Sequence, residues 1–217
     1  MAGQAITVQA VKQREGTNRF RITLCFEGNG TEERSLDILG AFLPFEVCSG
    51  AVLNAEMAAE LLHADEVSRA VMKGADLLDL ADHSQKQLVD KLRRRGFSAK
   101  TAGEAVQYLA KRGMLREEAY MVRCMEYLCN KRRLGPMRIG MELAAKGIRP
   151  TAYRQLYEQT MGRLDFDAAL EARLSTLRPD AFATPDAKRK TIAALQRYGF
   201  PLSMIRHAAE SKAERND

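Results

Sequence analysis

Three runs of basic residues are the most concentrated groups of charged side chains in the sequence. They are Arg93-Arg94-Arg95, Lys131-Arg132-Arg133 and Lys188-Arg189-Lys190, and Arg138 adds a further charge close to the second run. Lysine and arginine bind phosphate oxygens and carboxylates without reading base sequence. These residues are therefore the candidate contacts to DNA or to an acidic protein partner.

Each run also has a purely structural interpretation, which the sequence leaves open. Arg93–Arg95 precedes Gly96 and so lies at a helix C-terminus, where cations complement the helix dipole. Lys131–Arg133 precedes Gly135-Pro136 and so lies at a helix end or in a loop. Lys188–Lys190 lies near a helix start, where cations oppose the dipole, and this mild misplacement favours a contact role.

No group of residues has the spacing of a catalytic or metal site. Asp82-His83-Ser84 contains the residue types of a catalytic triad, but adjacent residues cannot form the relay geometry, and Ser84 is better explained as a helix cap. His63 and His207 are isolated, and there is no phosphate-binding loop of the Walker type. We therefore expect a protein that is not an enzyme and that needs no cofactor or metal.

The charge is unevenly distributed along the 217 residues. The net charge is +6, of which residues 1–64 contribute −3 (five basic, eight acidic) and residues 65–217 contribute +9 (29 basic, 20 acidic). Such a field favours a polyanion or an acidic protein as partner. Aromatic residues make up only 6% and there is no Trp, which argues against a stacking platform for single-stranded nucleic acid.

The N-terminal segment and the cysteines predict a cytoplasmic protein. Residues 1–10 have neither the basic start nor the apolar segment of a signal peptide, and no stretch approaches the roughly 20 apolar residues that span a membrane. The cysteines form no C-x-x-C pair or regular framework, so we expect reduced, mostly buried thiols. They are Cys25, Cys48, Cys124 and Cys129.

The pattern that must position these residues changes from strand to helix along the chain. Residues 5–11 and 19–26 read as strands, and residues 31–39 start as a possible third strand that passes into a short helix near 36–42. Asn54 predicts the cap of a helix over 54–62, and helical spacing continues over 66–81, 84–95 and 98–113. The methionines and tyrosines of the helical part fall at helical spacing and are interpreted as core residues, although methionine also suits an adaptable interface.

A repeated helix stop organises the second part. Gly96, Gly147 and Gly199 are separated by 51 and 52 residues, each with a leucine four residues earlier and a large apolar residue immediately after. This pattern predicts three copies of a three-helix unit, each with a left-handed glycine that ends its second helix. We expect an N-terminal β-rich domain over 1–64 and repeats over 65–115, 116–164 and 165–217, the last with a frayed polar tail. Neighbouring repeats should share core and stack into an elongated, curved array.

Three segments of the repeat region resemble the RecX family of regulatory proteins. They are HSQKQLVDKLRRRGFS at 83–98, LAKRGMLREEAYMVRCM at 109–125 and GPMRIGMELAAKGI at 135–148. The last segment is the most specific. It contains Gly-Pro, Arg-Ile, Glu-Leu and Lys-Gly-Ile in the same order as the family. The resemblance covers about residues 66–213, and the strand-rich start resembles the N-terminal extension of some RecX proteins.

The resemblance implies a mainly α fold of tandem three-helix repeats and a regulatory role. RecX proteins bind the RecA recombinase in the groove of the RecA–DNA filament, block filament growth and lower the ATPase, strand-exchange and coprotease activities of RecA. Some members also bind DNA. We therefore expect a cytoplasmic, monomeric modulator of RecA in recombination and the SOS response. The alternative is a DNA-binding helical repeat protein without a recombinase partner.

Overall fold

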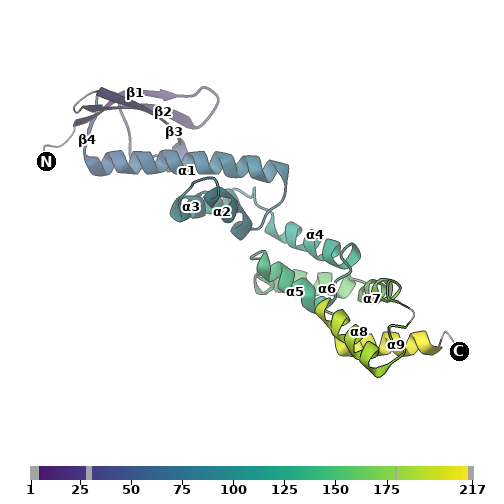
Figure 1. Cartoon of the computed structure of the whole chain (residues 1–217). Helices are drawn as coiled ribbons and strands as arrows, with labels where there is room; N and C mark the ends of the chain where they lie inside the picture. The colour runs from purple at the N-terminus through teal and green to yellow at the C-terminus, as the bar shows by residue number, and fades with distance from the viewer. Residues whose placement is uncertain (1–4, 28–30, 179, 215–217) are drawn as a thin grey trace. The chain divides into compact units, whose positions relative to one another are not determined.

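The structure is a computed structural model that describes residues 5–27, 31–178 and 180–214 (Figure 1). Residues 1–4, part of the segment on which the absence of a signal peptide is predicted, lie outside the described residues. The chain divides into two compact units. Unit 1 comprises Met1–Asp82 and Gln87–Leu115, and unit 2 comprises His83–Lys86 and Arg116–Asp217.

A four-stranded antiparallel sheet begins unit 1. Its strands are β1 (Ala5–Gln13), β2 (Arg19–Glu27), β3 (Thr31–Leu39) and β4 (Val52–Leu53), in the order β3-β2-β1-β4. The strands predicted at 5–11 and 19–26 are confirmed. Ile22 and Leu24 are fully buried on the inner face of β2, as their alternation predicts, and Ile22 pairs with Leu36 of β3.

The short helix predicted near 36–42 is wrong for most of its length. β3 continues to Leu39, and only Gly40–Phe42 form a 3-10 turn, η1. Leu36 and Ile38 are buried, and they alternate with Asp37 along the strand. Pairing with β2 and burial of every second side chain therefore determine the conformation here, not the helical tendency of the segment.

One long helix, α1 (Ala55–Leu80), replaces the two helices predicted at 54–62 and 66–81. Asn54 caps it, as predicted. No glycine or proline interrupts residues 62–66, and the buried Asp65 carboxylate accepts hydrogen bonds from the Asp37 amide (2.8 Å) and from Arg69 (2.9 Å). A polar residue with these partners is compatible with a buried helix interior, so the helix continues past it.

The helices after α1 complete three consecutive groups of three. They are α2 (Gln85–Arg93) and α3 (Ala99–Lys111); α4 (Glu117–Asn130), α5 (Pro136–Ala145) and α6 (Arg154–Arg163), with the 3-10 helix η2 (Pro150–Tyr153) before α6; and α7 (Phe166–Leu174), α8 (Pro185–Arg197) and α9 (Leu202–Glu214). The predicted fold class is confirmed: tandem three-helix groups follow a small strand-rich part.

The predicted domain boundaries and the elongated, curved shape stay predictions. The boundary between residues 64 and 65 falls inside α1. Of the tail that is predicted to fray, residues up to Glu214 continue α9, and residues 215–217 lie outside the described part. Within the described residues, no helix is both long and apolar enough to cross a membrane.

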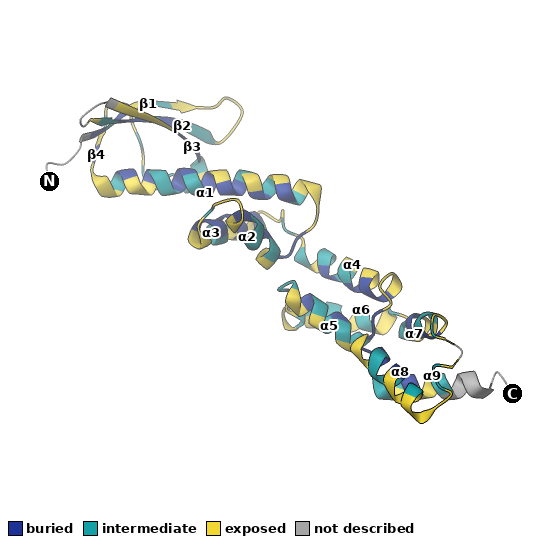
Figure 2. Ribbon diagram, viewed as in Figure 1, coloured by how far each residue is buried: buried dark blue, intermediate teal, exposed yellow. Residues whose placement is uncertain are grey.

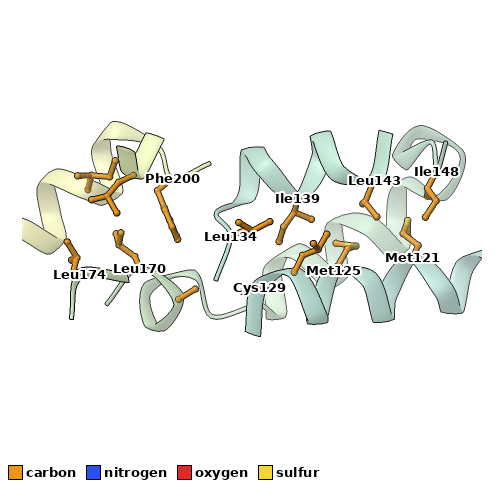
Figure 3. Close-up of a cluster of buried hydrophobic side chains, with 14 residues drawn as sticks. Met121, Met125, Cys129, Leu134, Ile139, Leu143, Ile148, Leu170, Leu174 and Phe200 are labelled. Carbon is orange, nitrogen blue, oxygen red and sulfur yellow. The ribbon is translucent and has the colours of Figure 1, made fainter. Parts of the chain in front are cut away.

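The second and third helix groups share one hydrophobic core, as predicted. Figure 3 shows this cluster, to which α4 contributes Met121 and Met125, α5 contributes Ile139, and Phe200 comes from the segment between α8 and α9. Unit 1 has separate clusters for its sheet and for its helices. Burial of large side chains from both groups makes the second and third groups one packed body.

The three predicted glycine helix stops are confirmed. Gly96, Gly147 and Gly199 have φ angles of +93°, +79° and +93°. In each case the amide of the following residue donates to the carbonyl of the leucine: Phe97 to Leu92 (3.4 Å), Ile148 to Leu143 (3.0 Å) and Phe200 to Leu195 (3.3 Å). This is the bond that closes a helix with a left-handed residue after its end. Gly113 ends α3 in the same way.

Two of these stops also join one helix group to the next. The Ser84 hydroxyl, at the start of α2, donates to the carbonyl of Lys146 (2.5 Å), and the amide of Gly135, at the start of α5, donates to the carbonyl of Tyr198 (2.9 Å). In both junctions, the start of a second helix packs on the stop of the next group's second helix. Gly147 and Gly199 lie at these contacts, so they serve packing as well as chain reversal.

Candidate partner-binding surface

The first basic run lies on the surface of unit 1. Arg93 is the last residue of α2, and Arg94 and Arg95 continue to Gly96; all three arginines are exposed. Arg95 donates to the carbonyl of Lys91 (3.2 Å), so this side chain partly serves the helix end on which it lies. Arg93 and Arg94 remain the cations of this run that extend from the helix stop.

The second basic run lies in the connection between α4 and α5, in unit 2. Lys131, Arg132 and Arg133 are exposed, and no ion pair joins their side chains to another described residue. Arg133 has a φ angle of +52° and is the one non-glycine residue with positive φ in the described part of the chain. A non-glycine residue in this region carries about 1–2 kcal/mol of conformational strain. The fold therefore keeps an arginine where the other helix stops use glycine.

Arg173, on α7, holds this connection in place. Its Nε donates to the carbonyl of Arg133 (3.1 Å) and its Nη2 to the carbonyl of Arg132 (2.6 Å). The same guanidinium lies 3.7 Å from the centre of the Tyr198 ring. A cation over an aromatic face adds about 0.5–2 kcal/mol of attraction. Sequence reasoning misses Arg173, because no local motif relates it to a loop 40 residues earlier.

Arg138 is the third residue of α5 and lies next to the second run. It pairs with Glu142 (2.9 Å), so part of its charge is offset. The backbone around Arg138 packs against Gly199, which brings the start of α5 to the end of α8. The structure therefore brings Arg138 and the second run together around one junction.

The third basic run lies at the other end of α8 and is partly neutralised. Lys188, Arg189 and Lys190 are exposed, but Asp186 accepts from both Arg189 and Lys190 (2.7 Å each). These two hydrogen bonds lower the pKa of Asp186. Asp186 lies in the first turn of α8, where a carboxylate complements the helix dipole. Asp186 therefore explains how cations are tolerated at this helix start. Their unfavourable position is weaker evidence for a contact role than the sequence alone suggests.

The residues of the apparent triad have structural surroundings. His83 and Ser84 are buried, and the Ser84 hydroxyl is used in the junction with Lys146. A serine whose proton is donated to a backbone carbonyl is not oriented as a nucleophile. In the part of the chain that the structure describes, no group of His, Cys, Asp and Glu residues has the geometry of a metal site.

The interpretation of the methionines as core residues is only partly right. Met121 and Met125 are fully buried, but Met137 and Met141 of α5 are 64% and 62% exposed, and Met114 is also exposed. The cysteines are free; Cys25 and Cys129 are buried, as expected, whereas Cys48 is exposed. α5 carries apolar residues on its buried side and on its exposed side. Helical spacing alone cannot show which of these residues face the core.

The residues on α5 and around its junction with α8 are the candidate surface in unit 2, which we call the α5 surface. It combines the second basic run and Arg138 with Arg173, which holds the α4–α5 connection, with the Tyr198 ring under Arg173, and with the two exposed methionines of α5. Its members are Lys131, Arg132, Arg133, Arg138, Arg173, Tyr198, Met137 and Met141.

The sequence comparisons agree with the family resemblance. Residues 70–109 match the model of the first three-helix domain of RecX. A regulatory protein RecX of Pelodictyon phaeoclathratiforme is 29% identical over 132 residues, which cover 61% of this chain and 81% of the relative. A regulatory protein RecX of Bacillus velezensis is 22% identical over 210 residues, which cover 94% of this chain and 76% of the relative.

Solved structures show the same fold. A crystal structure of regulatory protein RecX superposes with a TM-score of 0.65 at 16% identity, covering 94% of this chain and 99% of the other. A crystal structure of RecX from Lactobacillus salivarius gives a TM-score of 0.50 at 18% identity, covering 68% and 97%. The resemblance to the RecX family that the sequence predicts is therefore confirmed.

Proposed function

We propose that this chain is a non-enzymatic regulator of the RecA recombinase. Its relatives carry the name regulatory protein RecX. The chain binds in the groove of the RecA–DNA filament, bridges neighbouring RecA subunits and stops filament growth. It thereby lowers the ATPase, strand-exchange and coprotease activities of RecA in recombination and the SOS response. It acts as a cytoplasmic monomer.

The observation that carries this proposal is the second basic run. Lys131, Arg132 and Arg133 are exposed without ion-pair partners among the described residues, and Arg173 fixes the backbone that presents them. Strained backbone that the surrounding structure maintains is typical of functional sites. Cations held in place bind an acidic partner at a smaller entropic cost than flexible ones.

The first and third runs extend the same mechanism. Arg93 and Arg94 offer exposed charge on unit 1, and Lys188 offers exposed charge on unit 2, next to the pairs of Asp186. Exposed charges act over about 8–10 Å at physiological salt, so separate patches make separate contacts along an extended partner. We expect the second run to contribute most, because its side chains are not engaged within the described residues, unlike those of Arg95, Arg189 and Lys190.

The test is the ATPase activity of RecA on single-stranded DNA, measured as the chain is added. We expect inhibition by the wild-type chain and no inhibition when Arg93–Arg95 and Lys131–Arg133 are all replaced by glutamate. The triple replacements of Arg93–Arg95, Lys131–Arg133 and Lys188–Lys190, made separately and with equal changes of charge, rank the three runs. Circular dichroism verifies that each variant is folded.

The outcomes separate mechanism from function. Unchanged inhibition by the folded six-residue variant would overturn the electrostatic mechanism. Absence of any effect of the wild-type chain, at stoichiometric amounts, on ATP turnover and filament length would overturn the function itself.

Direct DNA binding without a recombinase partner is the second candidate function. The net charge of +6 and the exposed basic runs favour it. A chain that acts in this way binds a DNA oligonucleotide on its own, with an affinity that falls steeply as salt rises. Fluorescence anisotropy of a labelled oligonucleotide from 50 to 200 mM salt, roughly the range over which such binding collapses, measures this.

A further inference from the structure

The outer side of α5 is an unusual surface for a helix in contact with water. Met137 and Met141 are exposed at positions i and i+4, and Ala144 and Ala145 continue the exposed strip. Figure 2 shows both buried and exposed residues along α5. The opposite side of the same helix buries Ile139 and Leu143 in the core (Figure 3). Apart from the Arg138–Glu142 pair, every residue of α5 is apolar or glycine, and a helix with so much apolar surface is normally covered on more than one side.

The charged residues that directly precede and follow α5 in the chain are all basic. Lys131, Arg132 and Arg133 precede α5, and Lys146 and Arg149 follow it. The single acid of α5 is Glu142, and it pairs with Arg138. The strip is therefore an apolar ridge of about 12 Å, the length of eight helical residues, with unpaired positive charge at one end and further cations at the other.

This combination selects the chemistry of the partner. Phosphate groups of a nucleic acid satisfy the cations but offer no apolar surface to cover the methionines. A protein helix with apolar residues on one side and acids around them satisfies both, because ridges of residues four apart pack into the grooves of a second helix. Methionine adapts its shape to such a partner, and the alanines permit close approach.

We propose that the exposed strip of α5 docks an acidic amphipathic helix of a protein partner. The inference rests on the proposed function, in which that partner is RecA, and it assigns the helix contact to the strip and the flanking cations Lys131–Arg133, while the first and third basic runs remain available to phosphate. Arg173 is a positioning residue for the surface, since it fixes the loop at the start of the strip.

The test separates protein binding from DNA binding. In the double variant M137Q/M141Q, which keeps side-chain length and adds no charge, we expect affinity for RecA to fall by about tenfold or more, as for loss of interface anchors. Binding of a single-stranded oligonucleotide should change less than about twofold, because the basic runs are intact. L80Q is the matched control, since Leu80 is an 83% exposed apolar residue outside α5.

A photoreactive amino acid at position 141 identifies the occupant directly. Cross-linking to a RecA helix with acids around an apolar face supports the inference, and cross-linking to DNA or to a second copy of this chain overturns it. Equal binding of RecA by wild type and M137Q/M141Q also overturns it, but leaves the proposed function intact. If the wild-type chain does not bind RecA at all, both the proposed function and this inference fail.

Discussion

Gly96 and Gly199 occupy the same position in the first and third helix groups, but they have different surroundings. Both have a φ angle of +93°, and both end the second helix of their group. A Cβ atom added to Gly96 meets no other atom within 4 Å, whereas one added to Gly199 collides with the backbone of Arg138. One glycine is required by conformation alone, and the other by conformation and by packing.

The comparison explains why the glycine recurs although its first copy is unobstructed. In the second and third groups, the stop receives the start of the preceding group's second helix, at Ser84 and at Gly135. No earlier group contributes such a helix start to Gly96. A repeat protein gains stability from its internal junctions, and its terminal stop keeps only the local requirement.

The largest effect is expected for Gly199→Ala compared with Gly96→Ala. Left-handed strain costs either variant about 1–2 kcal/mol. Gly199→Ala adds overpacking of about 1–3 kcal/mol, because the obstructing atoms belong to backbone that cannot rotate away. Urea unfolding of both variants measures the difference. Equal losses would contradict the assignment of a packing role to Gly199.

Gly147→Ala should fall between these two variants, at about 2–3 kcal/mol. Its added methyl group meets the side chain of Lys86, 2.5 Å from the Cβ and Cδ atoms. The outer part of a lysine side chain can move, unlike the backbone at Gly199. The double variant G147A/K86A should therefore recover part of the loss. Absence of recovery in G147A/K86A, which keeps the Lys86 Cβ, would assign the obstruction to that atom and not to the outer part of the side chain.

Gly135→Ala isolates packing from conformation. Gly135 has an ordinary φ angle of −78°, but an added Cβ collides with the backbone of Gly199. We expect a loss of about 1–3 kcal/mol from overpacking alone. Gly103→Ala is the control, since Gly103 lies within α3 with no atom near its Cβ position, and alanine should stabilise that helix by up to about 1 kcal/mol.

The sequence predicts the stops and misses what they contact. Gly96, Gly147 and Gly199 can be found because the left-handed cap is a local motif of a few residues. The junctions of Ser84 with Lys146 and of Gly135 with Tyr198 join residues 62 and 63 positions apart, and no local pattern encodes them. The same reason conceals the clamp that Arg173 forms on the second basic run.

Two errors of the sequence analysis have a common physical origin. The segment 36–42 and the methionines of α5 both have patterns that fit more than one environment. Leu36 and Ile38 become strand residues because β2 lies beside them, and Met137 becomes exposed because its side of α5 faces no other described element. Contacts with other parts of the fold decide the conformation and burial of such segments. The basic residues of the candidate site could therefore be predicted from the sequence, but not their grouping with Arg173 and the methionines in the α5 surface.

The next largest loss of stability is expected for Arg173→Lys. Replacing it by lysine keeps the charge but removes the planar fork that binds two carbonyls and stacks on Tyr198. We expect a loss of about 1–2 kcal/mol, from hydrogen bonds of an ionised donor and the cation–π contact. The same replacement of Arg154, an exposed arginine of unit 2 paired with Glu158, should change the free energy of unfolding by under about 0.5 kcal/mol.

Arg133→Gly should have the smallest effect on stability and the most informative effect on binding. Arg133 shares the left-handed backbone conformation of Gly96 and Gly199, although it follows the first helix of its group, so the replacement removes strain of about 1–2 kcal/mol. Added freedom of the unfolded chain offsets about 0.4–1 kcal/mol of that gain. The folded variant should therefore be as stable as the wild type or slightly more stable, while it inhibits the RecA ATPase less.

Arg133→Ala, which removes the charge and keeps the strain, is the matched control. Weaker inhibition by both variants, with higher stability only for glycine, would mean that the strain is retained for the arginine side chain. Full inhibition by both would remove Arg133 from the contact surface and leave its conformation as a feature of the α4–α5 connection alone.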